Sequence, residues 1–171
     1  LLVSATGTGK TYLSAFDVAR TKPGRVLFLA HRKRILDASK RSYEKLLGGA
    51  YDYAIYETGM DCSKCSCVFA MCSTISKHLD EFDPGEFDYI IVDEAHRTGS
   101  ASYRAIMAYF TPAFYLGMTA TPNRTDGYDV FALFNHVIAY QITLQDALAN
   151  EMLVPFHYFG IADLTIDYQD E

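Results

Sequence analysis

The stretch Ser4-Ala-Thr-Gly-Thr-Gly-Lys-Thr11 decides the fold, because it joins an apolar run, Leu1 to Val3, to a helical pattern over residues 11–20. Its two glycines let the backbone curl so that successive N–H groups point inward, and the N-terminus of the helix adds positive potential. A strand, such a loop and a helix together form a site for phosphate groups. Loops of this kind usually open with glycine, and Ser4 supplies the small side chain that the position needs.

The residues of the loop have separate roles in this interpretation. Lys10 reaches the β- and γ-phosphates of a nucleotide, and the Thr11 hydroxyl binds Mg²⁺. The predicted nucleotide-binding residues are Thr6, Gly7, Thr8, Gly9, Lys10 and Thr11. The alternative is a glycine-rich turn between a strand and a helix that binds nothing.

The composition indicates one compact domain. The chain has 171 residues, of which 50% are hydrophobic and 21% charged, with 11 Gly and 5 Pro, which excludes a disordered or collagen-like chain. No apolar run approaches the ~18 residues that a membrane span needs, and no basic-then-apolar leader opens the sequence. We therefore expect a soluble, cytoplasmic protein without a membrane partner.

Short apolar runs alternate with helical patterns along the chain. The expected strands are Leu1 to Val3, Val26 to Ala30, Tyr53 to Tyr56, Val68 to Met71, Tyr89 to Val92 and Phe114 to Met118. A helix is expected over residues 33–47, with Ile35, Leu36, Tyr43, Leu46 and Leu47 on its apolar face. The repeated order of strand, helix and strand predicts an α/β fold with a mainly parallel sheet and helices on both faces.

The net charge of 15 − 21 = −6 conceals a division along the chain. Residues 1–50 carry ten Lys or Arg against three carboxylates, a net of +7, whereas residues 51–171 carry five against eighteen, a net of −13. Phosphate contact depends on where the cations cluster on a surface and not on their total. The overall acidity therefore does not exclude a nucleic-acid partner.

A second motif, Phe87-Asp-Tyr-Ile-Ile-Val-Asp-Glu-Ala-His96, ends an expected strand in two carboxylates. Open parallel sheets bind ligands beyond the carboxyl ends of their strands, so Asp93 and Glu94 should arrive beside the phosphate loop. Asp93 would hold Mg²⁺ together with Thr11, and Glu94 would orient and partly deprotonate the water that attacks the γ-phosphorus. The predicted catalytic residues are thus Glu94, Lys10 and Asp93. Taken alone, two carboxylates after a strand are also typical of a solvated turn.

Four ordered motifs give the chain a family resemblance. The phosphate loop, Asp93-Glu-Ala-His96, Leu116-Gly-Met-Thr-Ala-Thr-Pro122 and Phe28-Leu-Ala-His-Arg32 resemble motifs I, II, III and Ia of the superfamily 2 helicases and translocases of the DEAH-box type, close to type III restriction-enzyme helicase subunits. The similarity continues through Asn123-Arg-Thr-Asp-Gly127 and Pro155-Phe-His-Tyr-Phe-Gly160. It implies a RecA-like P-loop NTPase lobe over residues 1–160 that lacks its upstream segment, with residues 161–171 beginning the connection to an absent second lobe.

The resemblance also assigns residues that couple the nucleotide to nucleic acid. In the family, the histidine of motif II and the threonines of motif III have this role, which implies His96, Thr119 and Thr121 here. Hydroxyl and imidazole groups can exchange hydrogen bonds as the γ-phosphate is bound or released. The alternatives are a capped strand end before Pro122 and an ordinary turn histidine.

The expected nucleic-acid-binding residues are Arg32, Thr58, Gly59 and Thr74. Arg32 lies in the basic stretch His31-Arg-Lys-Arg34, which suits contact with phosphates. Relatives commonly carry an acidic residue after this arginine, whereas Lys33 follows it here. The alternative is that the stretch forms a solvated helix face. Thr74 follows Ser73, which replaces the glutamine of a Thr-x-Gln-Thr-like pattern. The aromatic stretch Phe156-His-Tyr-Phe159 could stack bases but is more typical of a half-buried strand.

Four cysteines, Cys62, Cys65, Cys67 and Cys72, invite comparison with a zinc site. A strand between Cys67 and Cys72 would separate them by roughly 16 Å and direct them to opposite faces. At most Cys62, Cys65 and Cys67 could share a metal, so we expect reduced cysteines and no zinc.

The leading hypothesis is the ATP-binding first motor lobe of an ATP-dependent DNA helicase or translocase, with ATP and Mg²⁺ as cofactors. Its partners would be nucleic acid, expected to be DNA, and a second RecA-like lobe that supplies an arginine finger. We therefore expect little hydrolysis from the isolated lobe. The alternatives are a non-catalytic nucleic-acid-binding or scaffold module that inherits the fold, and another P-loop enzyme such as a kinase.

Overall fold

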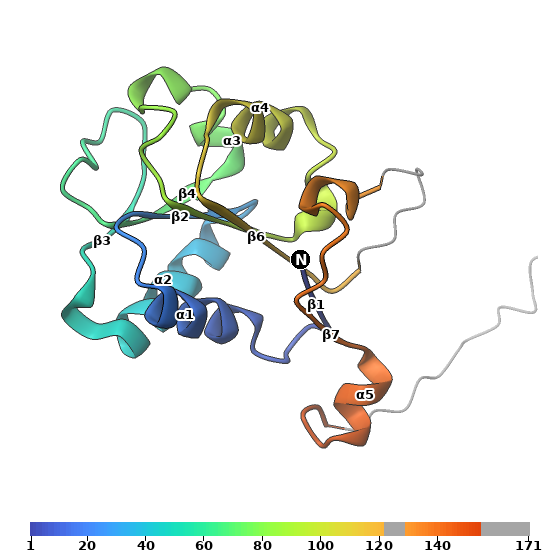
Figure 1. Ribbon diagram of the computed structural model, residues 1–171. Helices are drawn as coiled ribbons and strands as arrows, with labels where there is room; N and C mark the ends of the chain where they lie inside the picture. Colours follow the sequence, from blue (N-terminus) through green and yellow to red (C-terminus); the bar gives the residue numbers. More distant parts are fainter. Residues whose placement is uncertain (122–128, 155–171) are drawn as a thin grey trace, which may run out of the picture.

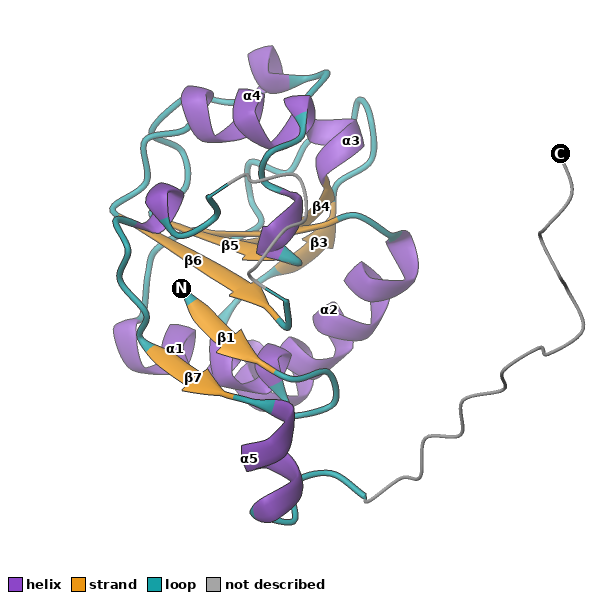
Figure 2. Ribbon diagram, turned by 90° about the vertical axis from the view of Figure 1, so that its right-hand side faces the viewer, coloured by secondary structure: helices purple, strands orange, loops and turns teal. Residues whose placement is uncertain are grey.

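The computed structural model describes residues 1–121 and 129–154, which form a layered α/β structure around one seven-stranded sheet (Figures 1 and 2). The strand order is β3-β4-β2-β5-β6-β1-β7, and every strand pairing in the described residues is parallel. The strands are β1 (Leu2–Ser4), β2 (Val26–Ala30), β3 (Tyr53–Ile55), β4 (Cys67–Met71), β5 (Tyr89–Asp93), β6 (Phe114–Thr119) and β7 (Tyr140–Ile142).

Helices cover both faces of the sheet. Figure 1 shows α1 (Lys10–Thr21) and α2 (Lys33–Leu47) on one face, with α3 (Cys72–Ile75) and α4 (Ala101–Tyr109) on the other. The short helix α5 (Leu144–Ala149) follows β7 and projects beyond the sheet. Together with the parallel strand order, this arrangement confirms the predicted RecA-like α/β fold.

Burial on both faces explains why the central strands are continuously apolar. Alternate residues of β2 enter different cores: Phe28 packs with Tyr43 and Phe69 on the α1–α2 side, and Leu27 joins the core on the α3–α4 side. The Tyr43 ring meets the rings of Phe28 and Phe69 edge-on at centroid distances of 5.7 and 5.4 Å. Its hydroxyl lies 2.7 Å from the Ser14 hydroxyl, which ties α2 to α1.

Most of the predicted elements lie within one residue of the observed ones. The helix over residues 33–47 is confirmed with the same bounds, and Leu36 and Tyr43 of its apolar face are buried. The predicted helix over residues 11–20 extends to 10–21. The prediction omitted β7, α3, α4 and α5, because two of the three residues of β7 are exposed and the helices are short, so none of them shows a clear periodic pattern.

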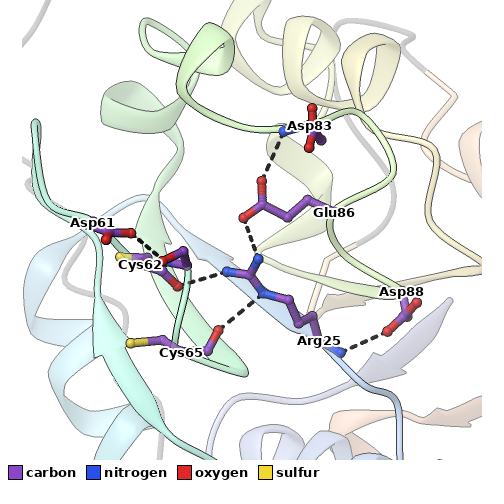
Figure 3. A network of polar contacts seen from close by, with 8 residues as sticks. Arg25, Asp61, Cys62, Cys65, Asp83, Glu86 and Asp88 are labelled. Carbon is purple, nitrogen blue, oxygen red and sulfur yellow. Dashed lines mark hydrogen bonds and ion pairs between the residues drawn. The ribbon is translucent and has the colours of Figure 1, made fainter.

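At the amino edge of the sheet, Arg25 joins three segments that are distant in the sequence (Figure 3). Its guanidinium donates to the carbonyl oxygens of Cys62 at 2.8 Å and Cys65 at 3.2 Å, and it forms an ion pair with Glu86. It also lies 5.2 Å from the centroid of the Phe87 ring. This network fixes the loop before β4 against the segment that leads into β5.

Candidate nucleotide and nucleic-acid site

The phosphate loop leaves the carboxyl end of β1 and leads directly into α1. Gly7 and Gly9 have φ angles of +88° and +85°, which side chains rarely allow, and Gly9 is the N-cap of α1. The Thr8 hydroxyl donates to the Ala5 carbonyl at 2.7 Å. The Lys10 ammonium donates to the carbonyls of Ser4 and Ala5 at 2.8 and 3.0 Å, so it lies within the curl of the loop.

The two carboxylates of the second motif lie at the same carboxyl edge of the sheet, where β5 ends. Asp93 is the last residue of β5 and is 9% exposed, and Glu94 follows with a left-handed backbone, φ +53°. This conformation costs about 1 kcal/mol or more for a residue with a side chain, and it turns the chain sharply after the strand. The turn η3 (Ala95–Arg97) begins immediately afterwards.

Electrostatic effects show that the loop and the carboxylates are close. Burial lowers the pKa of Lys10, while the charges of Glu94 and Asp93 act in the opposite direction. Burial, and then repulsion from Glu94, raise the pKa of Asp93 to about 6, although Lys10 partly offsets them. A cation opposite these groups, such as a metal ion, would favour the ionised form of Asp93.

A cavity of about 580 Å³ brings the predicted nucleotide residues together, a volume within the range of small-molecule sites. Its lining includes five of the six, Thr6, Gly7, Gly9, Lys10 and Thr11, together with both predicted carboxylates, Asp93 and Glu94, and we call it the nucleotide cavity. Thr8 is not among the lining residues, and its side chain instead bonds within the loop to Ser4 and Ala5.

The donor set in this cavity fits Mg²⁺. The Thr11 hydroxyl and the Asp93 carboxylate are oxygen ligands, which Mg²⁺ prefers, and both line the same space. Within the part of the chain that the structure describes, no three His, Cys, Asp or Glu residues are grouped to hold a metal by themselves. Mg²⁺ does not require such a cage, because it usually binds through one or two protein groups, waters and substrate phosphates.

Sequence patterns missed the contribution of α2 to this cavity. Arg34, Ile35, Ala38, Ser39 and Ser42 also line it, from a single face of the helix. Their spacing of three and four residues was visible in the sequence, but the amphipathic pattern placed Ile35 on the core-facing side and did not connect the helix with the nucleotide.

The three predicted coupling residues form a chain of polar contacts that reaches Glu94. The Nδ1 atom of His96 lies 3.2 Å from Oε2 of Glu94 and 3.1 Å from the Thr119 hydroxyl oxygen. The Thr121 amide donates to the same hydroxyl at 3.2 Å. A change at Glu94 can therefore be transmitted to the end of β6 through groups in direct contact.

The predicted nucleic-acid residues are divided between three places. Thr58 and Thr74 line one cavity of about 260 Å³ with Lys33, at the ends of β3 and β4, and we call this the strand cavity. Arg32 instead lines the nucleotide cavity, and Gly59 lines a separate cavity beside Arg25. The structure thus brings together Thr58 and Thr74 but not the whole predicted set.

The cysteines lie on both sides of the sheet. Cys67 is buried in the core under α1 and α2, whereas Cys62 and Cys72 belong to the opposite core, against which Cys65 packs. The predicted separation of Cys67 and Cys72 is confirmed, and the sheet also separates Cys67 from Cys62, which disfavours the alternative of a metal shared by Cys62, Cys65 and Cys67. Burial raises the pKa of Cys72 to about 12.

Some sequence predictions lie outside the described residues. These are the similarity through Asn123–Gly127, the aromatic stretch Phe156–Phe159 and the connection at residues 161–171. In residues 1–121 and 129–154, no helix has the length and hydropathy required to cross a membrane.

The fold and the ordered motifs define a P-loop lobe of the helicase class. Residues 1–124 match the family described as type III restriction enzyme, res subunit, and the chain belongs to this family. Across 99% of its length it is 32% identical to the type I restriction enzyme EcoAI endonuclease subunit of Escherichia coli. It spans 22% of that relative, so it corresponds to one part of a longer subunit.

Solved structures share the same architecture. The Hef helicase domain of Pyrococcus furiosus superposes with a TM-score of 0.67 at 24% identity, covering 82% of this chain and 34% of that one. The Sulfolobus solfataricus SWI2/SNF2 ATPase core, solved in complex with dsDNA, gives a TM-score of 0.62 at 16% identity, covering 77% and 30%. The chain therefore has the fold of a superfamily 2 helicase first lobe.

Proposed function

We propose that this lobe binds and hydrolyses Mg·ATP within a DNA helicase or translocase. The observation that carries the proposal is the single cavity that holds Lys10, Thr11, Asp93 and Glu94 together. Phosphoryl transfer depends mainly on positioning and charge stabilisation, and these four groups supply both. A module that only binds nucleic acid has no need for this combination.

Each residue has a distinct part in the proposed reaction. The N–H groups of the phosphate loop and the Lys10 ammonium hold the β- and γ-phosphates. Thr11 and Asp93 would hold Mg²⁺, which supplies charge neutralisation when it is bound. Glu94 orients the attacking water and accepts its proton.

The contacts of His96 support coupling between hydrolysis and nucleic acid. His96 contacts both Glu94 and Thr119, so a change in the hydrogen bonding of Glu94 reaches the ends of β5 and β6. Thr58 and Thr74 lie at the same edge of the sheet and would bind the nucleic-acid backbone. DNA is the proposed nucleic acid, because the SWI2/SNF2 core of the same fold is bound to dsDNA.

The complete reaction requires a second RecA-like lobe in the full-length protein. We place the first lobe at residues 1–160 and the beginning of the connection at residues 161–171. An arginine from the other lobe would stabilise the transition state, which can contribute about 10³-fold or more in phosphoryl transfer. The 171-residue chain by itself should therefore hydrolyse ATP weakly or not at all.

The test is ATP hydrolysis by the full-length protein with and without single-stranded and duplex DNA. The substitution Glu94→Gln should lower the rate about 10²- to 10⁴-fold while ATP remains bound, because the amide cannot accept the proton of the attacking water. Glu44→Gln is the matched control, since Glu44 lies on α2 and pairs with Lys40.

DNA stimulation that Glu94→Gln removes and Glu44→Gln keeps would support the proposal. Nucleic-acid binding without hydrolysis under any of these conditions would contradict it and favour a binding module. Phosphorylation of a small molecule in place of hydrolysis would indicate another class of P-loop enzyme.

A further inference from the structure

A second polar cavity, which we call the Arg97 cavity, lies at the carboxyl edge on the α3–α4 side of the sheet. Its volume is about 390 Å³. Three segments that follow strands β2, β4 and β5 form it, and its lining residues are His31, Cys72, Ser73, Arg97, Gly99, Ser100, Ser102 and Tyr103. Neither the nucleotide cavity nor the strand cavity shares any of these residues.

The lining of the Arg97 cavity is suited to an anion. It contains the hydroxyls of Ser73, Ser100 and Ser102, and no carboxylate is among its lining residues. Arg97 is exposed, and in the described part of the chain its guanidinium forms no ion pair. An arginine in a cavity that is lined by serines and by no carboxylate can bind a ligand of opposite charge.

His31 provides a second, independent observation. Its Nδ1 atom is buried and has no hydrogen-bond partner in the described structure, although buried polar atoms are nearly always paired. Burial lowers the pKa of His31 most, and the positive charges of Arg97 and Arg32 lower it further. His31 therefore experiences the positive charges of Arg97 and Arg32, which Glu94 partly offsets, and it has an unused hydrogen-bonding atom.

We propose that the Arg97 cavity binds a backbone phosphate of the nucleic-acid strand. Arg97 supplies the charge, and the hydroxyls of Ser73 and Ser102 donate to the phosphate oxygens. The inference rests on the proposed function, because it assumes that the lobe binds nucleic acid. It adds a contact that the sequence motifs did not assign.

The position of the cavity fits the path of a strand across the lobe. Ser73 adjoins Thr74, which lines the strand cavity with Thr58 and Lys33, so consecutive residues of α3 line the two cavities. Together they offer separate places for phosphates of one backbone along the carboxyl edge of the sheet. Contacts of this kind position a strand without reading its sequence.

The cavity is also linked directly to the proposed catalytic carboxylate. The Arg97 amide donates to the Glu94 carbonyl at 2.8 Å, and the turn between them contains His96. A phosphate held by Arg97 would thus restrain the turn that positions Glu94. Strand binding and water activation would be connected through four consecutive residues.

The experiment measures the binding of fluorescein-labelled single-stranded and duplex DNA to the purified full-length protein by anisotropy over a salt series. Arg97→Gln should raise the Kd about tenfold and lower the magnitude of the salt slope by about 0.7 to 0.9, the value for one lost phosphate contact. Arg104→Gln is the matched control, because Arg104 is exposed on α4 and outside the cavity lining. Arg97→Lys should restore most of the affinity, and thermal unfolding of each variant verifies its fold.

The outcomes distinguish failure of the proposed phosphate contact from failure of the proposed function. Equal affinities for Arg97→Gln and Arg104→Gln, or weaker binding with an unchanged salt slope, would overturn the phosphate contact while leaving DNA binding intact. If the wild-type protein bound neither form of DNA, the proposed function itself would fail at its nucleic-acid step.

Discussion

Two arginines at opposite edges of the sheet illustrate how this lobe separates folding from binding. Arg25, at the amino edge, has its guanidinium bonded to two carbonyls and paired with Glu86 (Figure 3). It also lies over the Phe87 ring. Arg97, at the carboxyl edge, is exposed beside hydroxyls and has no ion pair within the described residues. The same type of side chain thus stabilises the fold at one edge and is available to a ligand at the other.

The carboxyl edge also contains the features of the proposed nucleotide site. The carboxyl edge contains the loop with Gly7 and Gly9 at positive φ, the left-handed Glu94 and the buried carboxylate of Asp93. Glycine adopts positive φ without strain, whereas the left-handed Glu94 backbone and the buried Asp93 carboxylate are unfavourable arrangements that native structures retain mainly at functional sites. At the amino edge, the charge of Arg25 is balanced by Glu86, and the guanidinium also bonds to two carbonyl oxygens.

The largest expected effect concerns the nucleotide. Lys10→Met should weaken Mg·ATP binding about a hundredfold, because it removes the charge that contacts the phosphates. It should change the free energy of unfolding by less than about 1 kcal/mol, since burial already disfavours the Lys10 ammonium. Fluorescence titration with a labelled ATP analogue and urea unfolding measure the two quantities. Retained ATP affinity would contradict the assigned role of the loop.

At the amino edge, Arg25→Met should have the opposite effect, because it should lower the free energy of unfolding and not ligand affinity. It leaves the partly buried Glu86 carboxylate and two carbonyls without their donor, so the protein should lose about 3 kcal/mol of stability in urea unfolding. Arg20→Gln is the control, because its pair with Asp17 is long and its side chain is 85% exposed. Similar free energies of unfolding for the two variants would contradict the claim that Arg25 stabilises the fold at the amino edge.

In the absence of nucleotide and Mg²⁺, Asp93→Asn should raise the free energy of unfolding of the protein. The pKa of Asp93 is raised from 3.8 to about 6 in the folded state, so the folded protein binds this proton more tightly than the unfolded chain does. The ionised carboxylate therefore reduces stability as pH rises from about 4 to about 6. The variant should gain about 3 kcal/mol above pH 6 and nothing below about pH 4 in urea unfolding with a chelator. A pH-independent gain would show that the charge is not its cause.

The smallest expected effect tests the contact between His96 and Thr119. Thr119→Val keeps the shape of a fully buried residue but removes the hydroxyl that contacts both His96 and the Thr121 amide. The ratio of DNA-stimulated to unstimulated ATP hydrolysis should fall about fivefold, the lower end of typical coupling energies. An unchanged ratio would place the coupling on another path.

The sequence predicts the features that depend on local order. The phosphate loop, the strand that ends at Asp93 and the helix over residues 33–47 follow from short patterns, and their association follows from the rule that parallel strands present ligand sites at one edge. The nucleotide cavity could therefore be anticipated from the two motifs. The family resemblance implies coupling roles for His96 and Thr119, and the structure places these two residues in contact.

Long-range contacts could not be predicted in this way. Arg25 meets Glu86 across 61 positions and Cys62 across 37, and nothing in the charge pattern distinguishes it from Arg97. The placement of Arg32 at the nucleotide cavity depends on how α2 packs against α1. Only the packed chain shows which charged groups have partners and which remain available.

The most direct test of this account compares the DNA affinities of Arg25→Met and Arg97→Gln under conditions where unfolding curves show both variants folded. If the carboxyl edge binds nucleic acid and the amino edge serves only the fold, Arg97→Gln should raise the Kd about tenfold and Arg25→Met should leave it unchanged. Equal losses of affinity in the two variants, or a loss confined to Arg25→Met, would contradict this division of the lobe.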